Sequence, residues 1–328
     1  MTLDFKQHWP VVGDSVGLEY DLFMTQVDPL AVHAPDNDPT RPQPMAWEQY
    51  SYEVREQWVK LLDSNPEESA VQSFLELHPA MIPGGSGDIG PGGHHGSQLS
   101  AVFRQPKLSG AGPLYVPDFM WVTKSSSLIT PILIEIEKPS KRWFNKDGTP
   151  TAHFTQAKDQ LDEWRSWFAE GSNPSLFRQK YMFGDQHLNR QLQPHFLLIY
   201  GRASEFTSDG GHRNPDVLRH KRGSKYAPDE TFMTFDSVKP RYDHQNTITV
   251  SMTTNGPVPF AFSPVFHTHG MTGLDAQFLG DPEVALQRSV MMSAERKAYL
   301  SQRWGHWKSI GAQRRDPHQP YATKGGLE

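Results

Sequence analysis

Three acidic residues have the types and the spacing of a carboxylate cluster. Asp118 lies in a predicted strand over residues 116–123, and Glu135 and Glu137 end the next one, over 130–137. If the two strands form a hairpin that is symmetric about the Ser-Ser turn between them, Asp118 lies opposite Glu135, with Cβ atoms about 4.5–5.5 Å apart. Glu137 returns to the same face because side chains alternate along a strand. We therefore predict that the three carboxylates converge on one face of a sheet.

This cluster predicts a metal site. Unpaired carboxylates repel one another, and a hard divalent cation that prefers oxygen ligands relieves the repulsion. Mg²⁺ suits phosphodiester chemistry, and Mn²⁺ can substitute for it; the metal would lower the pKa of a bound water and stabilise charge on the phosphate. The alternative is a set of solvated acids on an open face. We favour the metal site because the acids stand among apolar residues, and unpaired buried carboxylates are costly.

Hydrophobic periodicity predicts the elements that would position these acids. Apolar residues at spacings of three and four indicate helices over 47–61, 66–77 (with Ser64 as its N-cap), 150–169 and, further on, 215–220 and 282–304. Short apolar or alternating runs indicate further strands over 101–104, 196–200 and 231–235. This order predicts an α/β fold with a small mixed sheet flanked by helices. We divide the chain into an N-terminal extension (1–62), a core domain (63–240) and a C-terminal extension (241–328).

Composition limits the possible functions. The chain has 328 residues and a formal net charge of −5, so a nucleic-acid enzyme would need a locally basic groove beside its acidic site. Cysteine is absent, which excludes disulfides and cysteine zinc sites and fits a reducing cytoplasm. The first ten residues do not resemble a signal peptide, and no run approaches about 18 apolar residues, so we expect no membrane span. No small-molecule cofactor is evident.

Two basic segments could contact nucleic acid. The first joins the predicted strand 130–137 to the helix after it, and its mixture of cations and aromatic residues could follow phosphates and stack an unpaired base; the alternative is a solvated loop. It contains Lys138, Lys141, Arg142, Trp143, Phe144 and Lys146. Arg202 follows a buried strand at its carboxyl end, where α/β sites often lie. The second segment is a basic helix face or a nucleic-acid contact: Arg213, Arg219, His220, Lys221, Arg222 and Lys225.

The order of several motifs resembles the nuclease domain of the Shedu anti-phage defence proteins, which belong to the PD-(D/E)xK nuclease superfamily. The resemblance covers about residues 65–240. The motifs are Phe74–Pro79, Pro117-Asp118-Phe119, Ile134–Pro139, Gln156 with Gln160, Ile199–Arg202 and Met233–Asp236. The PD and ExK motifs alone are short, and their order together with the other blocks is much more specific.

The resemblance implies a restriction-endonuclease-like core that nicks or cleaves phage or plasmid DNA with Mg²⁺, and assembly into a homo-oligomer. By position, Asp118 and Glu135 would be metal ligands, and Glu76 could add a ligand from the preceding helix. Gln156 matches the catalytic glutamine, and Gln160 would contact the nucleic acid. Polar helix residues without such roles are the alternative for Glu76 and the glutamines.

The sequence departs from the family pattern at one position. The signature lysine would fall at 137, where this chain has Glu137, followed by Lys138. Either Glu137 is a further metal ligand, which we favour, or a bulge turns Lys138 inward to orient the attacking water. The predicted function is a metal-dependent DNA endonuclease. The alternatives are an inactive nuclease fold that binds or senses DNA, and a structural assembly protein.

Overall fold

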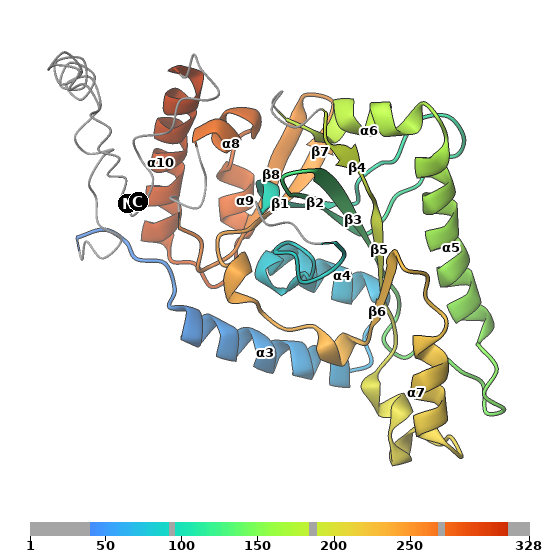
Figure 1. Cartoon of the computed structure of the whole chain (residues 1–328). Coiled ribbons are helices and arrows are strands. Elements are labelled where there is room, and N and C mark those ends of the chain that lie inside the picture. The colour runs from blue at the N-terminus through green and yellow to red at the C-terminus, as the bar shows by residue number, and fades with distance from the viewer. Residues whose placement is uncertain (1–39, 92–95, 184–188, 268–272, 314–328) are drawn as a thin grey trace, which may run out of the picture.

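The computed structural model of the chain describes residues 40–91, 96–183, 189–267 and 273–313. These residues form a mixed eight-stranded sheet flanked by helices, which confirms the predicted α/β class (Figure 1). The strands are β1 (Ser97–Arg104), β2 (Phe119–Lys124), β3 (Leu128–Ile136), β4 (Gln191–Leu192), β5 (His195–Ile199), β6 (Glu230–Met233), β7 (Ile248–Thr253) and β8 (Gly256–Phe262). The helices are α3 (Trp47–Asp63), α4 (Glu68–Leu77), α5 (Ala152–Ala169), α6 (Asn173–Tyr181), α7 (Pro215–Gly223), α8 (Gly273–Phe278), α9 (Glu283–Arg288) and α10 (Ala294–Gln313). Short 3₁₀ turns are η1 (Pro79–Met81), η3 (Ala203–Phe206), η4 (Ser208–Gly210), η5 (Phe235–Ser237) and η6 (Tyr242–His244).

The strand order in the sheet is β6-β5-β3-β2-β1-β7-β8, with β4 also paired to β3. The strands β5 and β6 run parallel to β3, β2 is antiparallel to β3 and β1, and β7 is parallel to β1. In the β2–β3 hairpin, Phe119 pairs with Ile134. This is the predicted register, and it brings Asp118 next to Glu135.

Strand alternation separates two hydrophobic cores. Met120 and Leu133 face the side covered by α5, where an aromatic stripe at helical spacing packs on the sheet. Phe119, Trp121 and Ile134 face the other side, covered by α3 and α4 (Figure 1). The acids of the β2–β3 hairpin alternate with the second set, so they share the α5 face.

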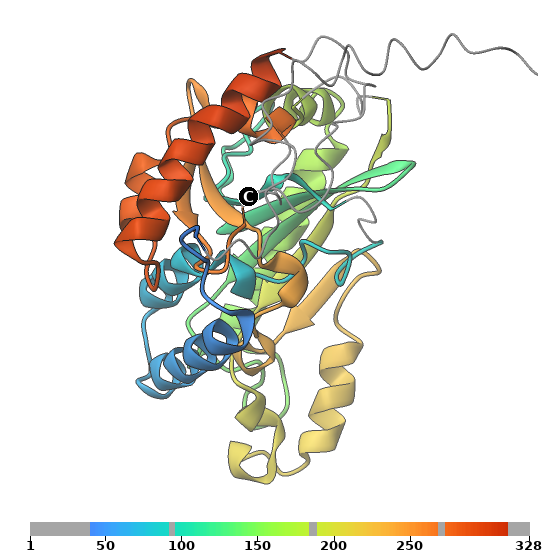
Figure 2. The same cartoon turned by 90° about the vertical axis from the view of Figure 1, so that its left-hand side faces the viewer.

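Residues 241–313 extend this sheet rather than standing apart from it. The strand β7 adds beside β1, and β8 adds at the edge. The predicted helix 282–304 is two helices, α9 and α10, separated where Met291 has a positive φ of 60°. In the ranges described, no helix combines the length and the apolar character needed to cross a membrane. Figure 2 shows that α7 protrudes beyond the body of the molecule.

The predicted N-cap of α4 is wrong. Ser64 instead follows the end of α3, where its N–H donates to the carbonyls of Lys60 and Leu61. The next residue, Asn65, has a positive φ of 54° and turns the chain, so α4 begins at Glu68. A left-handed asparagine is a common way to end a helix, which explains why the sequence Ser-Asn-Pro stops one helix rather than starting another.

The loop after η1 packs tightly on Trp121. A Cβ on Gly85 would lie 2.7–2.9 Å from three atoms of the buried indole ring. We expect Gly85→Ala to lower the free energy of unfolding by about 1–3 kcal/mol, because a rigid ring in a packed core must shift. Urea unfolding would measure this. Gly171→Ala is the matched control, since a Cβ there meets nothing within 4 Å; equal losses in the two variants would contradict the prediction.

Candidate functional site

The structure brings the three predicted acids together at the end of β3. Asp118 directly precedes β2, Glu135 is the next-to-last residue of β3, and Glu137 follows the strand. The backbone N–H of Ile136 donates to Asp118 Oδ2 over 2.8 Å. This bond holds the Asp118 carboxylate at the end of β3, between the two glutamates.

Glu135 is buried among like charges. It is 8% exposed, and its Oε2 has no hydrogen-bond partner among the described residues. Burial and then the charges of Asp118 and Glu137 raise the Glu135 pKa well above its usual range, while a hydrogen bond from Gln160 on α5 opposes the shift. The predicted Gln160 therefore contacts the acid cluster itself, whereas Gln156 lies exposed one turn earlier.

The pKa of Asp118 is raised in a similar way. Burial raises its pKa, the hydrogen bond from Ile136 lowers it, and the charges of Glu68, Glu137 and Glu76 raise it again, giving a pKa of about 7. Carboxylates with raised pKa values at one location are typical of functional sites, where the protein tolerates repulsion that a ligand relieves.

The helix α4 adds two acids, one of which sequence reasoning missed. Glu68 and Glu76 are eight residues apart and so lie on one side of α4. Glu76 is buried and accepts from Arg104 Nε over 2.7 Å. Burial, followed by the charge of Glu137 and a hydrogen bond with it, raises the Glu68 pKa. Glu76 thus has a cationic partner in the protein, and Glu68 is the α4 acid that contacts Glu137. The helical spacing from Glu76 was the signal that could have found it.

The cation next to the cluster is Lys141, not Lys138. Lys138 extends toward α4 and forms an ion pair with Glu67. The chain then turns, with the N–H of Lys141 donating to the carbonyl of Lys138 over 2.9 Å, and the Lys141 side chain returns to form an ion pair with Glu137. The turn after β3 therefore moves the lysine nearest the acids three residues further along the chain.

A cleft of about 240 Å³ is linked to the acid cluster through Lys141, which lines the cleft and pairs with Glu137. Its lining includes three predicted nucleic-acid contacts: Lys141, Arg142 and Arg202. Arg202 forms ion pairs with Asp236 at 2.9 Å and with Asp63 at 3.4 Å, which fix its position. Arg142 is 48% exposed at its side chain and is the most accessible of the three. The lining also contains the acids Glu205 and Asp209, so the exposed Arg142 is the group best placed to contact a phosphate there.

The idea that Trp143 and Phe144 stack an unpaired base is wrong, because both are core residues. Trp143 is fully buried, with its ring 4.9 Å from Phe154 and 5.0 Å from Tyr200 between centroids. The buried Glu205 accepts hydrogen bonds from the backbone N–H groups of Trp143 and Phe144 at 2.9 and 3.0 Å. The aromatic residues of this segment anchor the loop, and Lys141 and Arg142 line the cleft.

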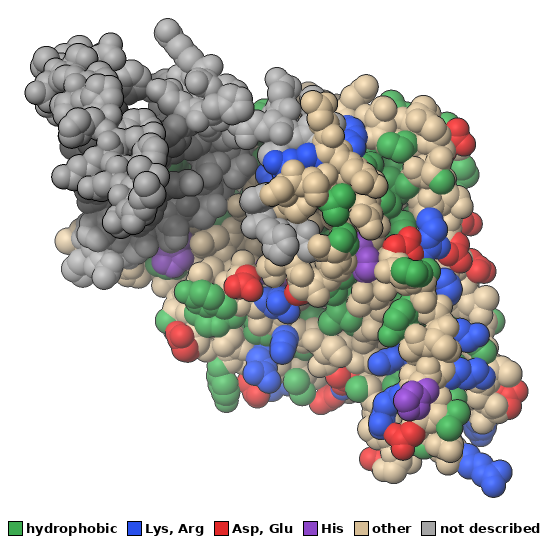
Figure 3. Space-filling view, in the orientation of Figure 1, with side chains coloured by type: hydrophobic (Ala, Val, Ile, Leu, Met, Phe, Trp, Pro, Cys, Tyr) green, Lys and Arg blue, Asp and Glu red, His purple; other side chains and the backbone are tan. Residues whose placement is uncertain are grey.

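Several cations of the second basic segment make contacts within the protein. Figure 3 shows cationic side chains gathered over α7, at the lower right. Three of them attach α7 to the body. Arg219 donates to the Phe206 carbonyl, Lys221 to the Gly148 carbonyl, and Arg222 lies over the Phe206 ring at 4.7 Å. Arg213 and, in the first segment, Lys146 stay exposed.

The chemistry of the cluster fits a hard divalent cation, since the donors are five carboxylates and one buried carboxylate oxygen has no partner. In the part of the chain that the structure describes, however, no three acidic or histidine side chains are arranged as a group that could hold a metal as they stand. A metal would therefore displace contacts that now hold the acids, such as the Lys141–Glu137 ion pair.

The fold and the site define an α/β protein with a carboxylate cluster and a cationic cleft at one end of a mixed sheet. The family model described as Shedu protein SduA, C-terminal, matches residues 65–238, which is more than half of the chain. The chain therefore belongs to the Shedu family, as the motifs predicted, and membership suggests a role in anti-phage defence. Comparison with curated proteins and with solved structures gives no match. The matched region contains all five clustered acids.

Proposed function

We propose that this protein is a metal-dependent DNA endonuclease of the PD-(D/E)xK type that nicks or cleaves phage or plasmid DNA. The observation that carries the proposal is the convergence of Asp118, Glu135 and Glu137 at the end of β3, beside a cleft lined by Lys141 and Arg142. Buried like charges are costly, and groups perturbed in this way cluster at functional sites. The same proposal includes assembly of the protein into a homo-oligomer and a location in the cytoplasm.

In this proposal, Asp118 and Glu135 hold Mg²⁺ or Mn²⁺, and Glu137 or Glu68 completes the set. When bound, the metal supplies an activated water and stabilises charge on the phosphate. Gln160 orients the Glu135 carboxylate through its hydrogen bond. Metal binding to Glu137 would release Lys141 from its ion pair, so that its ammonium could contact the phosphate in the position that the signature lysine serves.

A cleavage assay on supercoiled plasmid distinguishes this proposal from its main alternative. With Mg²⁺ or Mn²⁺ the purified protein is expected to convert plasmid to the nicked or linear form, and excess chelator should stop it. One observation favours an inactive DNA-binding module: Arg104 and Lys141 already pair two of the acids. DNA that is retained on a gel but never cut with any divalent metal would establish that alternative. No retention at low salt would point to a structural assembly role.

The cleft makes a separate prediction about DNA binding. Arg142→Ala is expected to weaken binding to a short duplex about three- to tenfold and to reduce the salt dependence by about one ion, because one phosphate contact is lost. Fluorescence anisotropy over a range of salt concentrations would measure both. Arg55→Ala, which changes an exposed arginine on α3 outside both basic segments, is the control. Equal effects of the two substitutions would mean that the cleft is not the phosphate site.

A further inference from the structure

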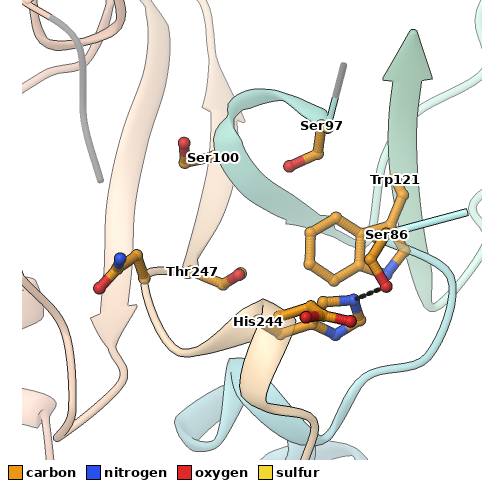
Figure 4. Close-up of a pocket in the computed structure, with 10 residues that line it drawn as sticks. Ser86, Ser97, Ser100, Trp121, His244 and Thr247 are labelled. Carbon is orange, nitrogen blue, oxygen red and sulfur yellow. Dashed lines mark hydrogen bonds between the residues drawn. The ribbon is translucent and has the colours of Figure 1, made fainter. Parts of the chain in front are cut away.

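A second cleft, of about 380 Å³, lies away from the acid cluster. It lies where β1 and β7 begin, whereas the acids lie near the end of β1, where Arg104 binds Glu76. Most of its lining residues have polar side chains (Figure 4). We call it the serine pocket, after its hydrogen-bonding residues Ser86, Ser97, Ser100, Asp243, Asn246 and Thr247. Trp121 of β2 also lines it, on the face of the strand opposite to Asp118.

The backbone at the pocket is bent in a way that ordinary strands avoid. Ser97 pairs with Thr123 and Val102 with Trp121, so β1 carries extra residues between these pairs. Within this bulge, Leu99 and Ser100 have positive φ values of 61° and 50°. Such conformations cost about 1–3 kcal/mol each for residues other than glycine and tend to cluster at functional sites. Bulges beside sites re-aim side chains, and here both Ser97 and Ser100 line the pocket.

The charge of the described lining residues favours an uncharged ligand over an anionic one. No lysine or arginine is among its described lining residues, and Asp243 contributes a carboxylate. His244 is uncharged at neutral pH because burial lowers its pKa to about 4, and its Nε2 is 3.2 Å from the Ser86 hydroxyl. Asn246 Oδ1 accepts from the backbone N–H of His267 over 2.8 Å, which fixes the amide and leaves its NH₂ group as a donor.

The floor of the pocket is aromatic. The rings of Trp121 and His244 lie 5.0 Å apart between centroids, and both residues are almost fully buried. Trp121 Nε1 has no hydrogen-bond partner among the residues that the structure describes. Buried polar atoms without partners are rare and call for an explanation such as a bound water or ligand. An aromatic edge beneath several hydroxyls suits a ring compound that is itself rich in hydroxyls.

We propose that the serine pocket binds an uncharged ring compound with adjacent hydroxyl groups, of about the size of a nucleoside. Asp243 would accept hydrogen bonds from two neighbouring hydroxyls, as acidic residues do for ribose. The hydroxyls of Ser97 and Thr247 and the amide of Asn246 would bind the remaining polar atoms. The volume falls within the range of about 300–1,000 Å³ that is usual for ligand pockets. Ribonucleosides and free sugars share this chemistry, and the inference does not rest on the proposed nuclease activity.

Calorimetry and thermal unfolding of the full chain can test the proposal with two panels of compounds. One holds the four ribonucleosides, and the other holds ribose, glucose and galactose. We expect binding within at least one panel, and the panel that binds identifies the source of the ligand. Addition of a 5′-phosphate to a nucleoside, or of a phosphate to a sugar, should weaken binding at least about tenfold because of Asp243. Absence of binding by every compound at millimolar concentration, or tighter binding of the phosphorylated forms, would overturn the proposal.

Two variants locate the binding. Asp243→Asn removes the carboxylate, and Ser97→Leu fills part of the cleft; each is expected to weaken binding at least about tenfold, or about 1.4 kcal/mol. Asp216→Asn, which changes an exposed acid on α7, is the matched control. Loss of binding in either variant whose own unfolding temperature is unchanged supports the proposal. Unchanged binding in both would place the ligand elsewhere and reject it.

Discussion

Substitution of Asp118 by Asn together with Glu135 by Gln is expected to lower the rate of metal-dependent DNA cleavage by at least about 10³-fold, or about 4 kcal/mol of transition-state stabilisation. The amides keep the volume of the carboxylates but lose the charge that would hold a divalent cation. Asp118 and Glu135 are the pair that the β2–β3 register brings together, and Glu135 has a buried oxygen without a partner. Single-turnover nicking of supercoiled plasmid, with Mg²⁺ and with Mn²⁺, would measure the loss.

The control for this experiment is Glu163→Gln, which changes an exposed acid on α5 and should leave the rate unchanged. The single variants Glu68→Gln and Glu76→Gln then separate the two α4 acids. We expect the Glu68 variant to need a higher metal concentration, because Glu68 contacts Glu137, while Glu76 is paired with Arg104. Cleavage by the double variant at the wild-type rate would remove these carboxylates from the mechanism.

Local patterns predicted the part of the site that depends on neighbouring strands. Alternation fixes which face a strand residue occupies, and a short hairpin fixes which residues pair, so the register of Asp118 and Glu135 followed from spacing alone. The same holds for α5, whose stripe of apolar residues at helical spacing buries Phe154, Leu161 and Trp164. In both cases a local periodicity in the sequence determines which side chains share one face of the strand or helix.

Contacts between distant segments were beyond such patterns. The strand β7 pairs with β1, and a parallel pair between segments so far apart in the chain leaves no local signal. The turn after β3 was equally hidden, and it decides that Lys141, rather than Lys138, lies beside Glu137. Glu68 was missed because an acid in the first turn of a helix usually serves the helix dipole; its helical spacing from Glu76 indicates a shared face, but its tertiary neighbours decide that it joins the cluster.

The stability of the metal-free protein should depend on pH through the acid cluster. The folded pKa of Asp118 is about 7, compared with 3.8 for an unperturbed aspartate, and that of Glu135 is also raised. Between about pH 4 and pH 7 the folded state binds more protons than the unfolded state. The contribution of these groups to the free energy of unfolding therefore falls as the pH rises. Asp118→Asn with Glu135→Gln should therefore be more stable than wild type by about 2–4 kcal/mol at about pH 8, and by little at about pH 4.

The difference between the two proteins is the informative quantity, because other groups titrate in the opposite sense. Burial lowers the pKa of His78 and of His244 to about 4, so each histidine adds stability as the pH rises from about 4 to about 6.5. These contributions are common to wild type and variant and cancel in the difference. Urea unfolding at several pH values, with Asp216→Asn as the control for an exposed acid, would measure it.

Divalent metal should narrow or close this difference. If Mg²⁺ binds the ionised cluster, at about a hundred times its dissociation constant it adds about 2.7 kcal/mol to wild type at about pH 8, and nothing to the double variant. The repulsion that destabilises the free protein would then be the source of its metal affinity. Parallel pH curves for wild type and variant would show that the carboxylates are relieved within the protein by Lys141 and Arg104. If metal does not close the stability difference between wild type and the double variant, the carboxylates repel one another but the ligand that relieves them is not the metal.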